Sequence, residues 1–208
     1  LVVLALGIPW GVGWVTHGQA HGMAQLFGWA GLFAMGIAYH VVPRFRNASI
    51  AYPWPQYLTL ALGLAAIVLR FVGQTLYSLP TSPALLVASG VALLAATGLF
   101  AVVIGQTLAR GSVPRGLTER WLWAGTVWAV AAAGVHMAMV ARVAFGRGLA
   151  MPATWDSAFL HASLLGFLGD YILGVSLRAV SAFMALRPVR QGLARAAFWA
   201  FNLGAAWQ

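Results

Sequence analysis

Long apolar segments separated by short polar connections make up most of the chain. A hydrocarbon core of ~30 Å needs about 20 residues of helix to cross it. Five segments reach that length, at residues 19–42, 54–76, 84–108, 121–145 and 154–184. Two shorter apolar segments, 1–15 and 196–207, are expected to be the end of a first span and the start of a seventh. Pro43 is expected to stop the second span, because proline interrupts helical hydrogen bonding.

These segments are expected to be helices. Backbone groups in hydrocarbon must be hydrogen-bonded within the protein, which leaves helices or a closed barrel, and the alternating pattern of barrel strands is absent. We therefore predict an all-α polytopic transmembrane helix bundle with about seven spans. Residues 1–208 are expected to form a single helical domain that is part of a longer chain.

Charge gives the bundle an orientation and excludes several classes of protein. Only 7% of the residues are charged, against about 25% in a soluble domain. Although the net charge is +9, the arginines lie in short connections between apolar segments, so we expect no nucleic-acid partner. Nine arginines fall on one side, namely Arg44, Arg46, Arg110, Arg115, Arg120, Arg178, Arg187, Arg190 and Arg195. The positive-inside rule predicts that this side is cytoplasmic, in a multi-pass protein of the bacterial inner membrane.

Histidines supply the candidate chemistry, since the chain has no cysteine and five histidines. His17 and His21 lie at the outer start of the second span, and His136 and His161 lie in the outer halves of two later spans. Neutral imidazoles from facing helices are the ligands of low-spin haem b. We predict His21 and His161 as its axial ligands, with His136 and His17 as alternates or as ligands of a second haem. The alternative is that each histidine only forms hydrogen bonds between helices.

Three other charged residues lie within or beside the spans. Arg70 and Arg142 are candidates to bind haem propionates, because guanidinium pairs bidentately with carboxylate. Arg142 could instead extend to the membrane interface. Asp170, near the middle of its span, could belong to a proton path or pair with an arginine.

Two parts of the chain resemble each other when residue 25 is placed on residue 163. Residues 25–29 then align with residues 163–167, and Gly31 and Gly36 align with Gly169 and Gly174. The offset equals four spans, which predicts a four-helix internal quasi-repeat.

The segment HGMAQLFG at 21–28, followed by Gly36, resembles the HAHxxLFGF signature of the NnrS family of polytopic membrane proteins. The stretch from His161 through Gly166 and Gly174 to Arg178 is similar to a later motif of that family. More distantly, the repeated units resemble subunit I of haem-copper oxidases and nitric oxide reductases. The resemblance implies haem, adds copper as a candidate metal and points to nitric oxide chemistry. Met23 replaces the family's second histidine, and the paired histidines of an oxidase copper site are not present.

Together these features predict a b-type haem protein that transfers electrons near the periplasmic face. We expect it to be a subunit of a respiratory or redox complex rather than an independent catalyst. Its expected partners are membrane lipid, other subunits, a periplasmic electron donor or acceptor, and quinone as a candidate. The alternatives are an NnrS-like haem and copper protein that handles nitric oxide, and a haem-free carrier or structural subunit.

Overall fold

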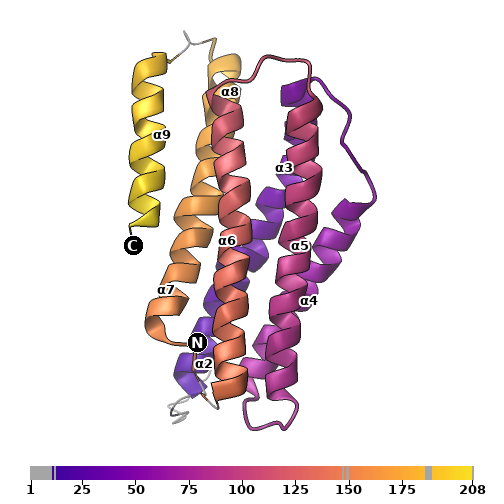
Figure 1. The fold of residues 1–208 in the computed structure, drawn as a ribbon, viewed down its shortest axis with the longest axis vertical. Helices are drawn as coiled ribbons and strands as arrows, with labels where there is room; N and C mark the ends of the chain where they lie inside the picture. Colours follow the sequence, from indigo (N-terminus) through magenta and orange to yellow (C-terminus); the bar gives the residue numbers. More distant parts are fainter. Residues whose placement is uncertain (1–10, 12, 147, 149, 186–188, 208) are drawn as a thin grey trace.

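A computed structural model describes residues 11, 13–146, 148, 150–185 and 189–207. Helix accounts for 84% of it, with no strand among the described residues, which confirms the prediction of an all-helical fold. Long helices lie side by side along one axis (Figure 1). In chain order the segments are α2 (Gly13–Met23), π-helical η1 (Ala24–Gly31), α3 (Leu32–Arg46), α4 (Pro55–Thr75), α5 (Ser82–Arg110), α6 (Leu117–Gly146), α7 (Ala153–His161), π-helical η2 (Ala162–Gly169), α8 (Asp170–Phe183) and α9 (Gln191–Ala206).

Several of these segments join end to end, so that five long helices result. They are Gly13–Arg46, Pro55–Thr75, Ser82–Arg110, Leu117–Gly146 and Ala153–Phe183, each long and apolar enough to cross a membrane. Large apolar side chains such as Trp29, Phe33 and Ile172 are exposed on the outside of the bundle. An exterior of this kind is stable only in contact with lipid. The chain is therefore a multi-pass membrane protein.

Aromatic side chains fill the centre of the bundle. The ring of Phe100 on α5 lies 6.1 Å from that of Phe167 on η2, 5.4 Å from that of Tyr39 on α3 and 5.9 Å from that of Tyr171 on α8. Phe27 on η1 packs on Phe167 at 6.0 Å. These contacts bring together helices that are distant in sequence, and they position the two π-helical segments against each other.

The ends of the second span differ from the sequence prediction. Residues 1–10 and 12 of the expected first span lie outside the described residues, while residues 13–15 already belong to α2. At the other end, α3 continues through Pro43 and ends where Asn47 adopts a left-handed backbone, with φ of 47°. Proline costs the helix one backbone hydrogen bond, and the helix accommodates this loss near its end.

Each of the two long composite helices contains a π-helical segment beside a histidine. The segment η1 begins three residues after His21, and η2 begins directly after His161. A π-helix is rare and often lies at a functional site, because its wider turn moves side chains and carbonyl groups out of the regular pattern. The two segments therefore direct attention to the histidines beside them.

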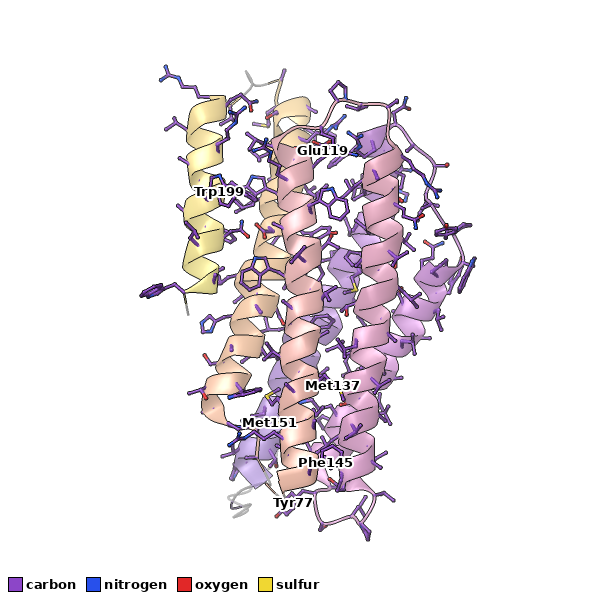
Figure 2. The ribbon with its side chains drawn as sticks, viewed as in Figure 1. Tyr77, Glu119, Met137, Phe145, Met151 and Trp199 are labelled. Atoms are coloured by element: carbon purple, nitrogen blue, oxygen red, sulfur yellow. The ribbon has the colours of Figure 1, made fainter. Side chains whose placement is uncertain are left out.

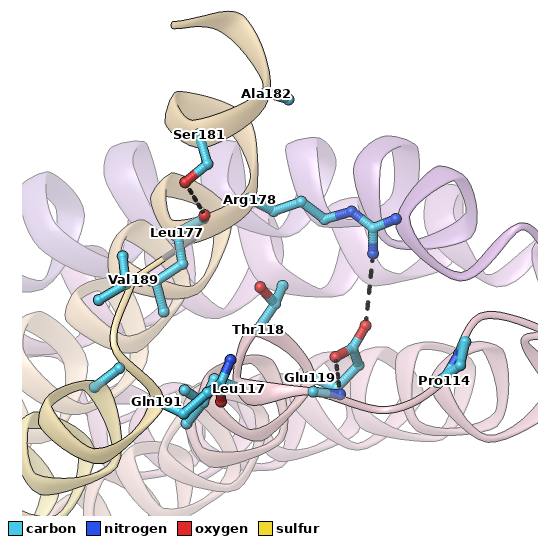
Figure 3. A pocket seen from close by; sticks show the side chains of 12 residues that line it. Pro114, Leu117, Thr118, Glu119, Leu177, Arg178, Ser181, Ala182, Val189 and Gln191 are labelled. Carbon is cyan, nitrogen blue, oxygen red and sulfur yellow. Dashed lines mark hydrogen bonds and ion pairs between the residues drawn. The ribbon is translucent and has the colours of Figure 1, made fainter. Parts of the chain in front are cut away.

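The arginine-rich connections meet at one end of the bundle. The Arg46 guanidinium donates to the carbonyl oxygens of Leu108, in the last turn of α5, and of Gly111 and Val113, which follow that helix. Glu119 at the start of α6 lies 3.8 Å from Arg46 and 3.7 Å from Arg178 on α8, as Figure 3 shows for the second pair. In Figure 2, Glu119 marks this end, opposite to Tyr77 and Phe145.

Candidate functional site

The histidines of α2 lie on one face of that helix, at the end of the bundle opposite to Glu119. The rings of His17 and His21 are nearly parallel, at 13°, with their centroids 6.3 Å apart. His17 also meets the ring of Phe71 on α4 edge-on at 5.3 Å. His21 is exposed on the side of the bundle. Because the helix begins at Gly13, both histidines are helical, and the expected alignment of residues four apart is present.

A local hydrogen bond fixes the tautomer of the neutral His161 ring. Its Nδ1 lies 2.8 Å from the carbonyl oxygen of Ser157, one helical turn earlier, and 3.1 Å from the hydroxyl of the same residue. A carbonyl oxygen only accepts, so Nδ1 carries the hydrogen, and in the neutral ring Nε2 then keeps its lone pair. This is the form in which an imidazole binds a metal, with the second nitrogen fixed by a backbone carbonyl.

The helices that carry His21 and His161 are neighbours at this level. A Cβ atom at Gly22 on α2 would lie 3.8 Å from Cδ2 of Leu160 on α7. Each of these contacting residues is adjacent in sequence to one of the two histidines. The two predicted axial ligands therefore lie on adjoining helices. Gly22, which has no side chain, lies at the contact between these helices.

His136 lies in a different environment, fully buried on α6. Its Nδ1 is 3.0 Å from a guanidinium nitrogen of Arg70, which only donates, so Nδ1 accepts. Its Nε2 lies 3.3 Å from the hydroxyl of Ser89, and that hydroxyl donates to the carbonyl of Leu86. Ser89 must then accept from Nε2. Both ring nitrogens are thus engaged in internal hydrogen bonds, which leaves no lone pair for a metal in this arrangement.

Arg70 on α4 is linked to α6 and α7 through side-chain hydrogen bonds. It donates from Nε to Gln74 at 3.0 Å, from Nη1 to His136 and from Nη2 to Asp156 at 3.1 Å, and its guanidinium lies 5.7 Å from the ring centroid of Phe159. Gln74 donates to Gln19 at 2.7 Å, and Gln19 binds the backbone of Met151. We call these residues the Arg70 network: Gln19, Arg70, Gln74, Ser89, His136 and Asp156. Since each guanidinium nitrogen already has a partner, this geometry does not favour Arg70 as a propionate ligand.

Sequence reasoning missed most of the Arg70 network. Asp156 had a usable signal, because the chain has only three acidic residues and this one lies in the same outer half as Arg70. A buried arginine requires an anionic partner, so the pair could have been proposed. Gln19, Gln74 and Ser89 carried a weaker signal as isolated polar residues in apolar helices.

Two residues remain to be placed: Arg142, a candidate propionate ligand, and His40, the fifth histidine. Arg142 is exposed on the last turns of α6, where its role as a propionate ligand stays a prediction. His40 is exposed on α3, towards the arginine-rich end. At Gly166 on η2, the ring of Trp128 occupies the space that a side chain would take. Within the described residues, no three or more histidine or acidic side chains gather at one point where a metal ion could be held.

No family model, no curated protein and no solved structure matches this chain. Function must therefore be inferred from the residues and from their geometry.

Proposed function

We propose that the protein binds haem b near the end of the bundle opposite to the arginines and carries electrons there. His161 and His21 are the proposed axial ligands. The observation that carries this proposal is the hydrogen bond from Nδ1 of His161 to the carbonyl oxygen of Ser157, which leaves Nε2 as a ligand atom. Bound haem would supply a one-electron centre, and the chain would hold and insulate it.

The Arg70 network supports this assignment by fixing the rotation of α7. Asp156 and Phe159 point into the bundle, where Asp156 binds Arg70 and Phe159 packs 5.5 Å from the His136 ring. Ser157 and His161 lie four residues apart on another face of α7. That face is less buried. Because the ion pair holds one face inward, the other face presents His161 in a defined direction. We therefore assign His136 and Arg70 a positioning role in place of ligand binding.

The proposed orientation has the arginine-rich end in the cytoplasm and the two proposed ligands near the periplasm, as in a bacterial inner-membrane protein.

The internal quasi-repeat is also part of this proposal. It is supported by the two π-helical segments, Ala24–Gly31 and Ala162–Gly169, because the offset that aligns the sequence motifs also places the first segment on the second. With the short α9 and the segment before Gly13 counted as parts of spans, the number of spans would be seven. Other subunits and quinone remain the proposed partners.

A copper ion at His17 and His21 is the second candidate. The two imidazoles lie four residues apart on one helix face with parallel rings, a spacing that metal sites on helices use. This arrangement supports the copper and nitric oxide alternative, since imidazole is a good copper ligand. Metal analysis of the purified protein, with and without the change His17→Ala, tests it directly.

A pyridine haemochrome assay on the purified protein tests the haem assignment. We expect a b-type haemochrome from the native protein. In the absorption spectrum of the folded protein without pyridine, we expect the low-spin form to be lost in the His161→Ala variant, because the ligand atom is removed. His21→Ala is expected to have the same effect. His40→Ala is the matched control, since it removes an exposed imidazole from the other part of the same long helix.

Two results would contradict the haem assignment. One is the absence of a b-type spectrum from protein made in cells supplied with haem. The other is an unchanged low-spin spectrum in the folded His161→Ala variant.

A further inference from the structure

Asp170 lies at the first position of α8, directly after the π-helical segment η2, in the interior of the long helix Ala153–Phe183. Its side chain is completely buried, with 0% exposure. It faces α6, where a Cβ atom at Gly125 would lie 3.1 Å from its own Cβ. The carboxyl group is thus enclosed between helices at the level of the apolar core.

The hydrogen bonds around Asp170 have a defined direction. The indole nitrogen of Trp128 on α6 donates to Oδ1 of Asn202 on α9 at 2.9 Å. An indole only donates, so this bond fixes which end of the Asn202 amide is oxygen. The amide nitrogen of Asn202 then donates to Oδ1 of Asp170 at 3.1 Å. Oδ2 of Asp170 has no hydrogen-bond partner among the described residues.

Asp170 takes part in none of the ion pairs found among the described residues. Next to it, α6 presents Gly125, Thr126 and Trp128, and the hydroxyl of Tyr171 is bonded to that of Thr126 at 2.8 Å. In the described part of the chain, the ion pairs lie at Arg46, Arg178 and Glu119 and at Arg70 and Asp156. An ionised carboxylate with one unsolvated oxygen is strongly unfavourable in an apolar interior, whereas the neutral acid is tolerated.

We propose that Asp170 is a proton-binding site within the membrane. Oδ1 is the carbonyl oxygen that accepts from Asn202, and Oδ2 carries the proton. The proton exchanges with the arginine-rich end of the bundle through a groove between α6, α8 and α9. This inference does not depend on haem binding.

The groove consists of two adjoining pockets that share Leu177, Val189 and Ala194. The outer one, of about 470 Å³, has polar walls that include Glu119, Arg178, Ser181 and Gln191 (Figure 3). The inner one, of about 330 Å³, is apolar and extends to Leu173 and Phe201. Leu173 is one helical turn from Asp170, and Phe201 is adjacent to Asn202. The groove therefore leads from the polar end of the bundle to the neighbourhood of the carboxyl group.

Labelling with N,N′-dicyclohexylcarbodiimide tests the site. This apolar reagent adds to a protonated carboxyl group, whose proton moves to a reagent nitrogen while the carboxyl oxygen bonds to the central carbon. We expect peptide mass spectrometry to find Asp170 modified, with a rate that falls as the pH rises. Asp156 is the internal control, because its ion pair with Arg70 keeps it ionised and unreactive. Equal labelling of both residues, or protection of Asp170 by sodium ions at constant pH, would overturn the proposal.

Infrared spectroscopy of the native protein and of Asp170→Asn gives an independent readout. The neutral acid predicts a carbonyl stretch of a protonated carboxyl group that disappears in this variant, because asparagine has the same shape without the acid. A spectrum that loses no such band in the folded variant would overturn the proposal even if labelling is blocked.

The route is tested by filling the groove. Ala197→Trp places a large ring in the inner pocket and is expected to slow the labelling of Asp170 about tenfold. Ala200→Trp is the matched control, because Ala200 is exposed on the same helix and does not line the groove. An unchanged rate in Ala197→Trp would exclude this route.

Discussion

Asp156 and Asp170 lie on the same long helix and both are buried, but the neighbouring helices give them opposite environments. Asp156 meets the guanidinium of Arg70 at 3.1 Å, within a network whose members are mutually hydrogen-bonded. Among the described residues, Asp170 accepts a hydrogen bond only from the amide of Asn202. Burial is common to both acids, and what differs is the partner that a neighbouring helix supplies: a guanidinium for Asp156 and an amide for Asp170.

The largest effect is expected when the centre of the Arg70 network is removed. Arg70→Met leaves Asp156 without its cation and deprives Gln74 and His136 of a donor, which should destabilise the protein by about 5 kcal/mol. Thermal unfolding in detergent micelles measures this loss. The double variant Arg70→Met with Asp156→Leu should regain at least half of it, because no unpaired charge remains. A double variant as unstable as the single one would contradict the role of the ion pair.

An intermediate effect is expected from Asp156→Asn. The amide oxygen can still accept from Arg70, but the negative charge is lost and the buried guanidinium is uncompensated, which should cost about 3 kcal/mol. The same unfolding assay applies. A variant with native stability would show that Arg70 is neutralised by another group.

The smallest effect is expected from the same substitution at the other acid. Asp170→Asn replaces a neutral carboxyl group by a neutral amide that can still accept from Asn202, so the change in unfolding free energy should stay within about 1 kcal/mol. The comparison of the two Asp→Asn variants is the sharpest test, because the chemical change is identical. Equal destabilisation at both positions would show that Asp170 is ionised and has a partner.

The sequence predicted the helical class and the five long spans from their apolar length. It was less accurate at the ends of the helices. Pro43 was expected to stop the second span, yet α3 extends to Arg46. A proline near the end of a helix removes one hydrogen bond without forcing the chain to turn, so its effect depends on the residues that follow.

The candidate site was predictable only in part. The concentration of histidines in the half of the bundle opposite to the arginine-rich end could be read from their positions along the spans, because each residue adds a fixed rise along a helix. The different hydrogen-bonding roles of these histidines could not be predicted from the sequence. His136 and His161 look alike in sequence, but one has both nitrogens engaged by Arg70 and Ser89, and the other has one nitrogen fixed by its own helix.

Apolar length and arginine placement determined by themselves that this chain crosses a membrane repeatedly with most of its arginines at one end, since both properties follow from local composition and the thickness of a bilayer. Only the tertiary structure decided which acid forms an ion pair with Arg70 and which one accepts a hydrogen bond from an amide. It also decided which imidazole keeps a lone pair. Those outcomes depend on how helices are rotated against one another, and that rotation is set by packing between residues far apart in the chain.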